Sequence, residues 1–180
     1  MDFTKNHFEL LGLPTDFIID LGALSDRYRQ LQKVVHPDRF VNASDLEKRQ
    51  SIQHSVQINE AYQTLKNPIT RAQYLLSLRG VELDAQKETT CDTLFLMEQM
   101  ELREKLEQIP NQPDAENALA EMLQKVSGLI KSHIAKMAVS FESHDKKSIE
   151  ETCEMIRKLQ FLNKLYFEIE TVEEQLEEQL

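Results

Sequence analysis

Residues that interrupt helices are scarce in this 180-residue chain, which holds only four glycines and five prolines. Over long stretches between them, apolar residues recur every three or four positions, the spacing of amphipathic helices. A chain with so few breaks leaves little room for strands and turns. The sequence therefore predicts an all-α fold.

The charges are divided unevenly along the chain. The formal net charge is -10, yet residues 1–79 carry ten Lys or Arg against nine Asp or Glu, which leaves +1. The remaining residues carry 11 against 22, which leaves -11. This asymmetry predicts two modules with different partners, and it disfavours nucleic acid or an anionic membrane as the target of the acidic module. A solvated helical surface is the alternative explanation.

The two cysteines, Cys91 and Cys153, lack the paired spacing of a disulfide framework or a zinc site. They are also too few for an iron-sulfur cluster, which usually takes four ligands. The N-terminus lacks the basic start and apolar run of a signal peptide, and no stretch approaches the roughly 18 apolar residues of a membrane span. We expect a cytoplasmic protein that holds no cofactor or metal.

The first module is predicted to contain two antiparallel helices. A short helix ends at Gly12, and the first long helix follows the N-cap Asp20 and ends before Pro37. The second begins at the capping box Ser44–Glu47 and closes at Asn67–Pro68. The apolar stripe of the first long helix consists of Leu24, Tyr28, Leu31 and Val35.

The turn between these helices carries the tripeptide His36-Pro37-Asp38. Arg29 and Lys33 project from the preceding helix roughly opposite its apolar stripe, with Arg27 at the border, so the exposed face is basic. A hydrolase using His36 and Asp38 as acid and base is one alternative, but the sequence shows no nucleophile or oxyanion site.

In its context, after "LLGL" and before "INEAYQTLKNPITRAQYL", the tripeptide resembles the J-domain family over residues 1–79. These co-chaperones stimulate ATP hydrolysis by DnaK-type chaperones. The resemblance implies that the turn docks on the ATPase domain while basic side chains steer the encounter. The chaperone-binding residues that it implies are His36, Pro37, Asp38, Arg27, Arg29, Lys33 and Arg39.

The second module is predicted to be a three-helix bundle, after a linker at residues 80–90 that lacks periodicity. On its first helix one side holds Phe95, Leu102, Leu106 and Ile109. A second side holds apolar residues rimmed by carboxylates, and Phe161 lies off the apolar seam of the third helix. Such a patch is typical of a partner site, although methionine and leucine on a helix are more often core.

The segments "CDTLFLMEQMELREKLEQI" and "IRKLQFLNKLYFEIETVEEQLEEQL" resemble the HscB family of iron-sulfur cluster co-chaperones. In that family the bundle binds the scaffold IscU and brings it to the chaperone HscA. The scaffold-binding residues that the resemblance implies are Leu96, Met97, Met100, Glu101, Glu104 and Phe161. Gln108 replaces a typical acidic residue and is therefore left out.

Together these features predict a J-domain at residues 1–79, a linker at 80–90 and a scaffold-binding three-helix bundle at 91–180. We expect a protein that is not an enzyme, with a monomer favoured. The alternative is a general J-domain co-chaperone with an unrelated client or a dimerising bundle.

Overall fold

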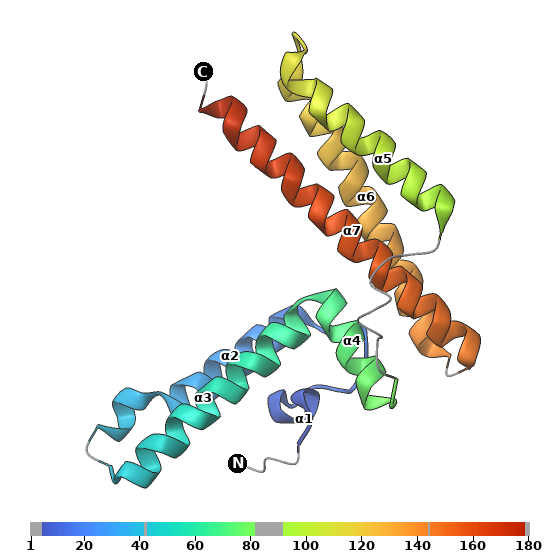
Figure 1. The fold of residues 1–180 in the computed structure, drawn as a ribbon. Coiled ribbons are helices and arrows are strands. Elements are labelled where there is room, and N and C mark those ends of the chain that lie inside the picture. Colours follow the sequence, from blue (N-terminus) through green and yellow to red (C-terminus); the bar gives the residue numbers. More distant parts are fainter. Residues whose placement is uncertain (1–4, 42, 82–91, 144, 179–180) are drawn as a thin grey trace. The chain divides into compact units, whose positions relative to one another are not determined.

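The structure is a computed structural model that describes residues 5–41, 43–81, 92–143 and 145–178, and every regular element among them is helical (Figure 1). The all-α prediction is therefore confirmed. The chain divides into two compact units, Met1–Val81 and Glu82–Leu180. The predicted linker lies outside the described residues except for residues 80 and 81.

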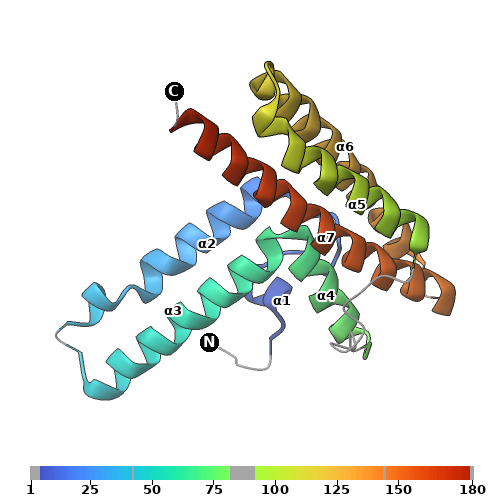
Figure 2. The ribbon, with the colours of Figure 1, turned by 45° about the horizontal axis from the view of Figure 1, so that its top comes forward.

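The first unit is a helical hairpin with two shorter helices packed beside it. Figure 2 shows the two long helices, α2 and α3, lying side by side. Buried side chains from all four α-helices form its core, and these include Phe8, Leu11, Leu24, Ile58, Leu65 and Leu76. Its elements are α1 (His7–Leu11), α2 (Leu21–Val35), the 3-10 helix η1 (Pro37–Phe40), α3 (Asp45–Lys66) and α4 (Pro68–Leu78).

The predicted helix ends are confirmed by their hydrogen bonds. Asp20 Oδ1 accepts the amides of Gly22 and Ala23 at 2.7 and 3.1 Å, and Ser44 and Glu47 form a reciprocal capping box. Gly12 ends α1 in the left-handed conformation with φ 66°. Such caps satisfy donors and acceptors that the helix itself leaves unpaired.

Helix α4 was not predicted as a separate element. The sequence indicates a stop at Asn67–Pro68, and α3 does end at Lys66, but α4 begins at once. Asn67 Oδ1 accepts the amide of Ile69 at 2.8 Å, and Pro68 occupies the first helical position. Asn followed by Pro can end one helix and start the next. Proline has no N–H to donate, and the N–H groups of a first helical turn have no partner within the helix.

The second unit is a three-helix bundle, as predicted. Both ribbon views show α5, α6 and α7 running alongside one another (Figures 1 and 2). The predicted core side of the first helix is buried, with Phe95, Leu102, Leu106 and Ile109 each no more than 7% exposed. Its elements are α5 (Thr93–Gln108), the 3-10 helix η3 (Ile109–Asn111), α6 (Ala115–Glu142) and α7 (Lys146–Glu177).

The buried face of α7 is wider than a simple seam. Leu162, Leu165 and Ile169 are each no more than 1% exposed, whereas Tyr166, between Leu165 and Ile169, is only half-buried. The core of this unit contains side chains from α5, α6 and α7. A helix that packs on two neighbours needs a broad apolar arc, which a single heptad seam underestimates.

Candidate functional site

His36 ends α2 and begins the turn that the sequence singled out. The backbone N–H of Asp38 donates to His36 Nδ1 at 3.3 Å, and Asp38 Oδ2 lies 3.5 Å from the same nitrogen. In a neutral ring Nδ1 can accept the amide hydrogen, whereas in a protonated ring it can only donate, and the carboxylate is then the nearby acceptor. Both side chains are exposed.

Two hydrogen bonds fix the end of α2 beneath this turn. The buried Ser51 hydroxyl on α3 donates to the carbonyl oxygen of Val35 at 2.6 Å. The Arg39 guanidinium donates to the carbonyl oxygen of Lys33 at 3.1 Å. The last carbonyls of a helix have no partner within it, so these two side chains cap α2. Arg39 therefore has a structural contact in addition to its predicted role.

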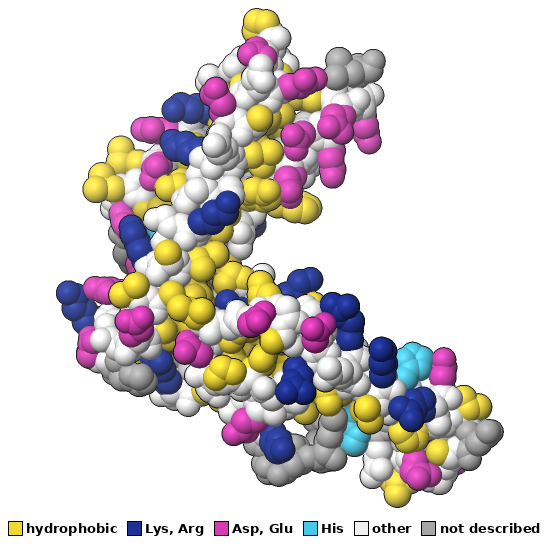
Figure 3. Space-filling model, turned by 180° about the vertical axis from the view of Figure 1, so that it is seen from behind, with side chains coloured by type: hydrophobic (Ala, Val, Ile, Leu, Met, Phe, Trp, Pro, Cys, Tyr) yellow, Lys and Arg dark blue, Asp and Glu magenta, His cyan; other side chains and the backbone are white. Residues whose placement is uncertain are grey.

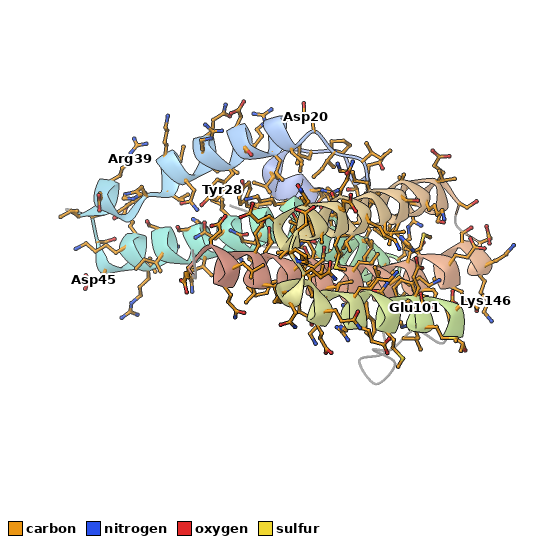
Figure 4. The ribbon with its side chains drawn as sticks, turned by 90° about the horizontal axis from the view of Figure 1, so that it is seen from above. Asp20, Tyr28, Arg39, Asp45, Glu101 and Lys146 are labelled. Carbon is orange, nitrogen blue, oxygen red and sulfur yellow. The ribbon has the colours of Figure 1, made fainter. Side chains whose placement is uncertain are left out.

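The predicted basic residues do not all lie on one side of α2. Arg29 and Lys33 are exposed one turn apart, and Arg29 pairs with Asp26 at 3.7 Å. Arg27 points to another flank, where α1 ends. Its Nε lies next to Gly12, the residue that caps that short helix, at 3.8 Å from the position that a Cβ atom on Gly12 would take. Figure 3 shows Lys and Arg side chains along the hairpin toward the end with the turn, and Figure 4 places Arg39 and Asp45 at that end.

Hydrogen bonds between polar side chains, together with a pair of stacked rings, join α3 to α2, the helix that carries the basic residues. Asn59 Oδ1 accepts from the Tyr28 hydroxyl at 2.8 Å and from Gln32 Nε2 at 2.7 Å. The rings of Tyr28 and Tyr62 stack with centroids 4.2 Å apart. The sequence pattern treated Tyr28 as part of an apolar stripe, and only the facing helix shows that its hydroxyl is bonded.

The second predicted site is the outer side of α5. Met97 and Met100 are 56% and 63% exposed, Glu101 and Glu104 are exposed, and Leu96 is half-buried. These residues occupy the side of α5 away from the buried stripe, as the 100° rotation per residue requires. Figure 4 labels Glu101 on this helix.

Phe161, predicted to lie off the apolar seam of the third helix, still contacts the core. It is half-buried and packs against the core cluster. Its ring meets the buried Phe95 edge to face, at 6.3 Å between centroids and 84° between planes. The Arg103 guanidinium lies 6.0 Å from the Phe161 centroid. Phe161 thus joins the bundle core to the outer side of α5.

Two ion pairs hold α5 to α7, and neither is predicted by the sequence pattern. Asp92, the N-cap of α5, pairs with Lys158, and Arg103 pairs with Glu168 through two N–O contacts of 3.2 Å. The hydrogen bond from Lys158, with that from the Phe95 amide, lowers the pKa of Asp92. Each pair joins residues 65 or 66 positions apart, so no local pattern marks them.

No group of three His, Cys, Asp or Glu side chains within the described ranges could hold a metal ion. Cys153 is half-buried, and burial raises the pKa of its thiol, while Cys91 lies outside the described residues. None of the described helices is long and apolar enough to cross a membrane.

Comparison with known proteins gives matches to both units. Residues 6–74 match the DnaJ domain family, and residues 91–170 match the family described as HSCB C-terminal oligomerisation domain. A "Co-chaperone protein HscB homolog" from Vibrio vulnificus (strain YJ016) is 49% identical over 95% of this chain and 98% of its own. The corresponding protein of Shewanella loihica is 42% identical over 95% and 99%.

Two solved structures are similar over most of the chain. "Chaperone HscB from Vibrio cholerae" superimposes with a TM-score of 0.86 at 43% identity, covering 96% of this chain and 99% of that one. The human co-chaperone protein HscB gives a TM-score of 0.85 at 33% identity, covering 96% and 84%.

Proposed function

The chain belongs to the HscB family of J-domain co-chaperones, and on that premise we propose that it delivers the iron-sulfur cluster scaffold IscU to an HscA/DnaK-type chaperone. In doing so it stimulates ATP hydrolysis by that chaperone. The observation that carries the proposal is the presence, in separate units of one chain, of the His36–Asp38 turn and the apolar, carboxylate-rimmed side of α5.

The two units divide the work. Residues 1–79 act as the chaperone-binding J-domain, residues 91–180 bind the scaffold, and residues 80–90 connect them. A covalent connection raises the effective concentration of one partner near the other, so moderate affinities at each site suffice.

The turn presents His36 and Asp38 to the chaperone from a fixed backbone. Since Ser51 and Arg39 cap the end of α2, little conformational freedom remains to be lost on binding. Arg29 and Lys33 steer the encounter through their exposed charges, and Arg27 acts from the neighbouring flank. Pro37 keeps the chain from continuing as α-helix at this point.

The outer side of α5 binds the scaffold through a small apolar surface. Methionine side chains adapt to the shape of a partner, and desolvation of Met97 and Met100 supplies the driving force. Glu101 and Glu104 favour a partner with cations at the rim. Phe161, which packs against the bundle core, extends this surface from α5 to α7, and Leu96 adds a half-buried apolar side chain on α5.

The covalent step belongs to the chaperone, which hydrolyses ATP in its own nucleotide site. The co-chaperone accelerates that step only if it binds the reactive conformation of the chaperone more tightly than the resting one. Its own side chains therefore bind and orient but break no bond.

The test measures ATPase stimulation and scaffold binding in the same preparations. Asp38→Asn should abolish stimulation of the chaperone and leave IscU binding unchanged. Met97→Ala with Met100→Ala should do the reverse. Asp45→Asn is the matched control, because Asp45 is exposed at the same end of the hairpin and is not assigned to the site. If Asp38→Asn stimulates as the original chain does, the proposal is wrong.

A further inference from the structure

Helix α5 exposes three large apolar side chains at a constant spacing of three residues. Leu94, Met97 and Met100 are 79%, 56% and 63% exposed. Leu94 lies outside the site that the family resemblance implies, yet it is the most exposed of the three. Positions three apart form a continuous ridge on a helix surface, inclined at about 45° to the axis. The three side chains therefore form one oblique row about 9 Å long along the helix axis.

A second row of carboxylates runs parallel to the first. Three of its carboxylates follow the apolar residues of the first row by four positions, about one helical turn, and a fourth continues the spacing of three. The members of this acidic row are Glu98, Glu101, Glu104 and Glu107. Glu98 is half-buried and the other three are exposed. None of the four takes part in an ion pair with another described residue.

Both ends of the apolar row are fixed to α7. The next position in the series is Arg103, which is held by Glu168 and covers Phe161, so the row ends there. At the other end the N-cap Asp92 is held by Lys158. Anchored ends keep the row in place before a partner arrives, which lowers the entropy cost of binding.

Single exposed apolar residues are common on protein surfaces and need no special explanation. Phe167 on α7 and Val139 on α6 are such cases, 69% and 66% exposed, with no large apolar residue three or four positions away. On α5, in contrast, each exposed apolar side chain has an apolar neighbour three positions away and an unpaired carboxylate four positions on.

We propose that the scaffold contacts α5 along these two rows, through an elongated segment that crosses the helix obliquely. Its apolar side chains face Leu94, Met97 and Met100, and its Lys or Arg side chains face the acidic row. This inference rests on the proposed function for the identity of the partner. It adds Leu94 and Glu107 to the contact surface and gives the direction of the bound segment.

The test uses the full chain and purified scaffold, with affinity and association rate measured for variants at the row ends. Leu94→Ala should weaken binding at least about fivefold, as truncation of a buried apolar contact does. Glu107→Gln should slow association and reduce its salt dependence. Val139→Ala and Glu116→Gln, at exposed positions on α6, are the matched controls and should bind like the original chain.

The outcomes separate this inference from the proposed function. If Leu94→Ala binds as well as Val139→Ala while Met97→Ala is weakened, the oblique rows are wrong and the scaffold site stands. If the original chain does not bind the scaffold, the proposed function fails. Self-association that Leu94→Ala abolishes, with scaffold binding unchanged, would show that the rows contact a second copy instead. Unchanged unfolding midpoints confirm that each variant folds.

Discussion

The hydrogen bond from Ser51 to Val35 offers a sharp test of the idea that the turn is fixed before it meets a partner. Ser51 is 3% exposed, and its hydroxyl donates to the terminal carbonyl of α2 at 2.6 Å. Ser51→Ala removes the donor and leaves a buried acceptor unpaired. The expected cost is about 1–3 kcal/mol of local stability.

Hydrogen exchange measures this cost directly. A loss of about 1–3 kcal/mol raises the population of the opened state by a factor of about 5 to 150. Amides in the last turns of α2 should exchange faster by that factor, while amides of the second unit should be unaffected. Stimulation of the chaperone should weaken as well, because a loosened turn must be reordered on binding.

Ser25→Ala serves as the control, since Ser25 also donates to a carbonyl, that of Leu21, but at an exposed site. It should change neither exchange at the end of α2 nor ATPase stimulation. Should the Ser51→Ala variant show the same hydrogen exchange and the same ATPase stimulation as the original chain, the hydrogen bond does not hold the turn.

Three further results are expected. Leu162→Ala should lower the free energy of unfolding by about 2–5 kcal/mol, because Leu162 is fully buried, whereas Phe167→Ala should change it little; equal effects in a urea titration would contradict the described core. Since the pKa of Asp92 is lowered, its stabilising contribution is present above the ordinary value of 3.8 and is lost as the pH falls through the folded value. Lys158→Met should therefore lower the melting temperature at pH 7 more than at pH 2, and an equal loss at both would exclude the ion pair as the cause. Added salt should slow association with the chaperone, and Lys33→Gln should reduce that dependence; a salt-independent rate would disprove electrostatic steering.

Local signals made much of the fold predictable. The caps at Asp20 and Ser44, the break at Pro37 and the buried stripe of α5 depend on residues within one or two helical turns of one another. Helix α4 was missed for the same kind of reason, because Asn67–Pro68 fits both the end of one helix and the start of another.

The candidate site was predictable only in part. The exposure of Met97 and Met100 follows from helical rotation, but the packing of Phe161 on Phe95 depends on how α5 and α7 meet. Likewise, the flank taken by Arg27 depends on where α1 lies.

The sequence by itself determined most of the helical segments, the side of α5 that faces the core, and the residues that carry the family resemblance. Only the tertiary structure decided that Ser51 on α3 caps the end of α2, and that Lys158 and Glu168 hold α5 in place. The physical reason is the separation along the sequence of the residues that interact. Helix formation and capping are governed by neighbours along the chain, whereas these contacts join helices whose relative position is set by the burial of a shared core.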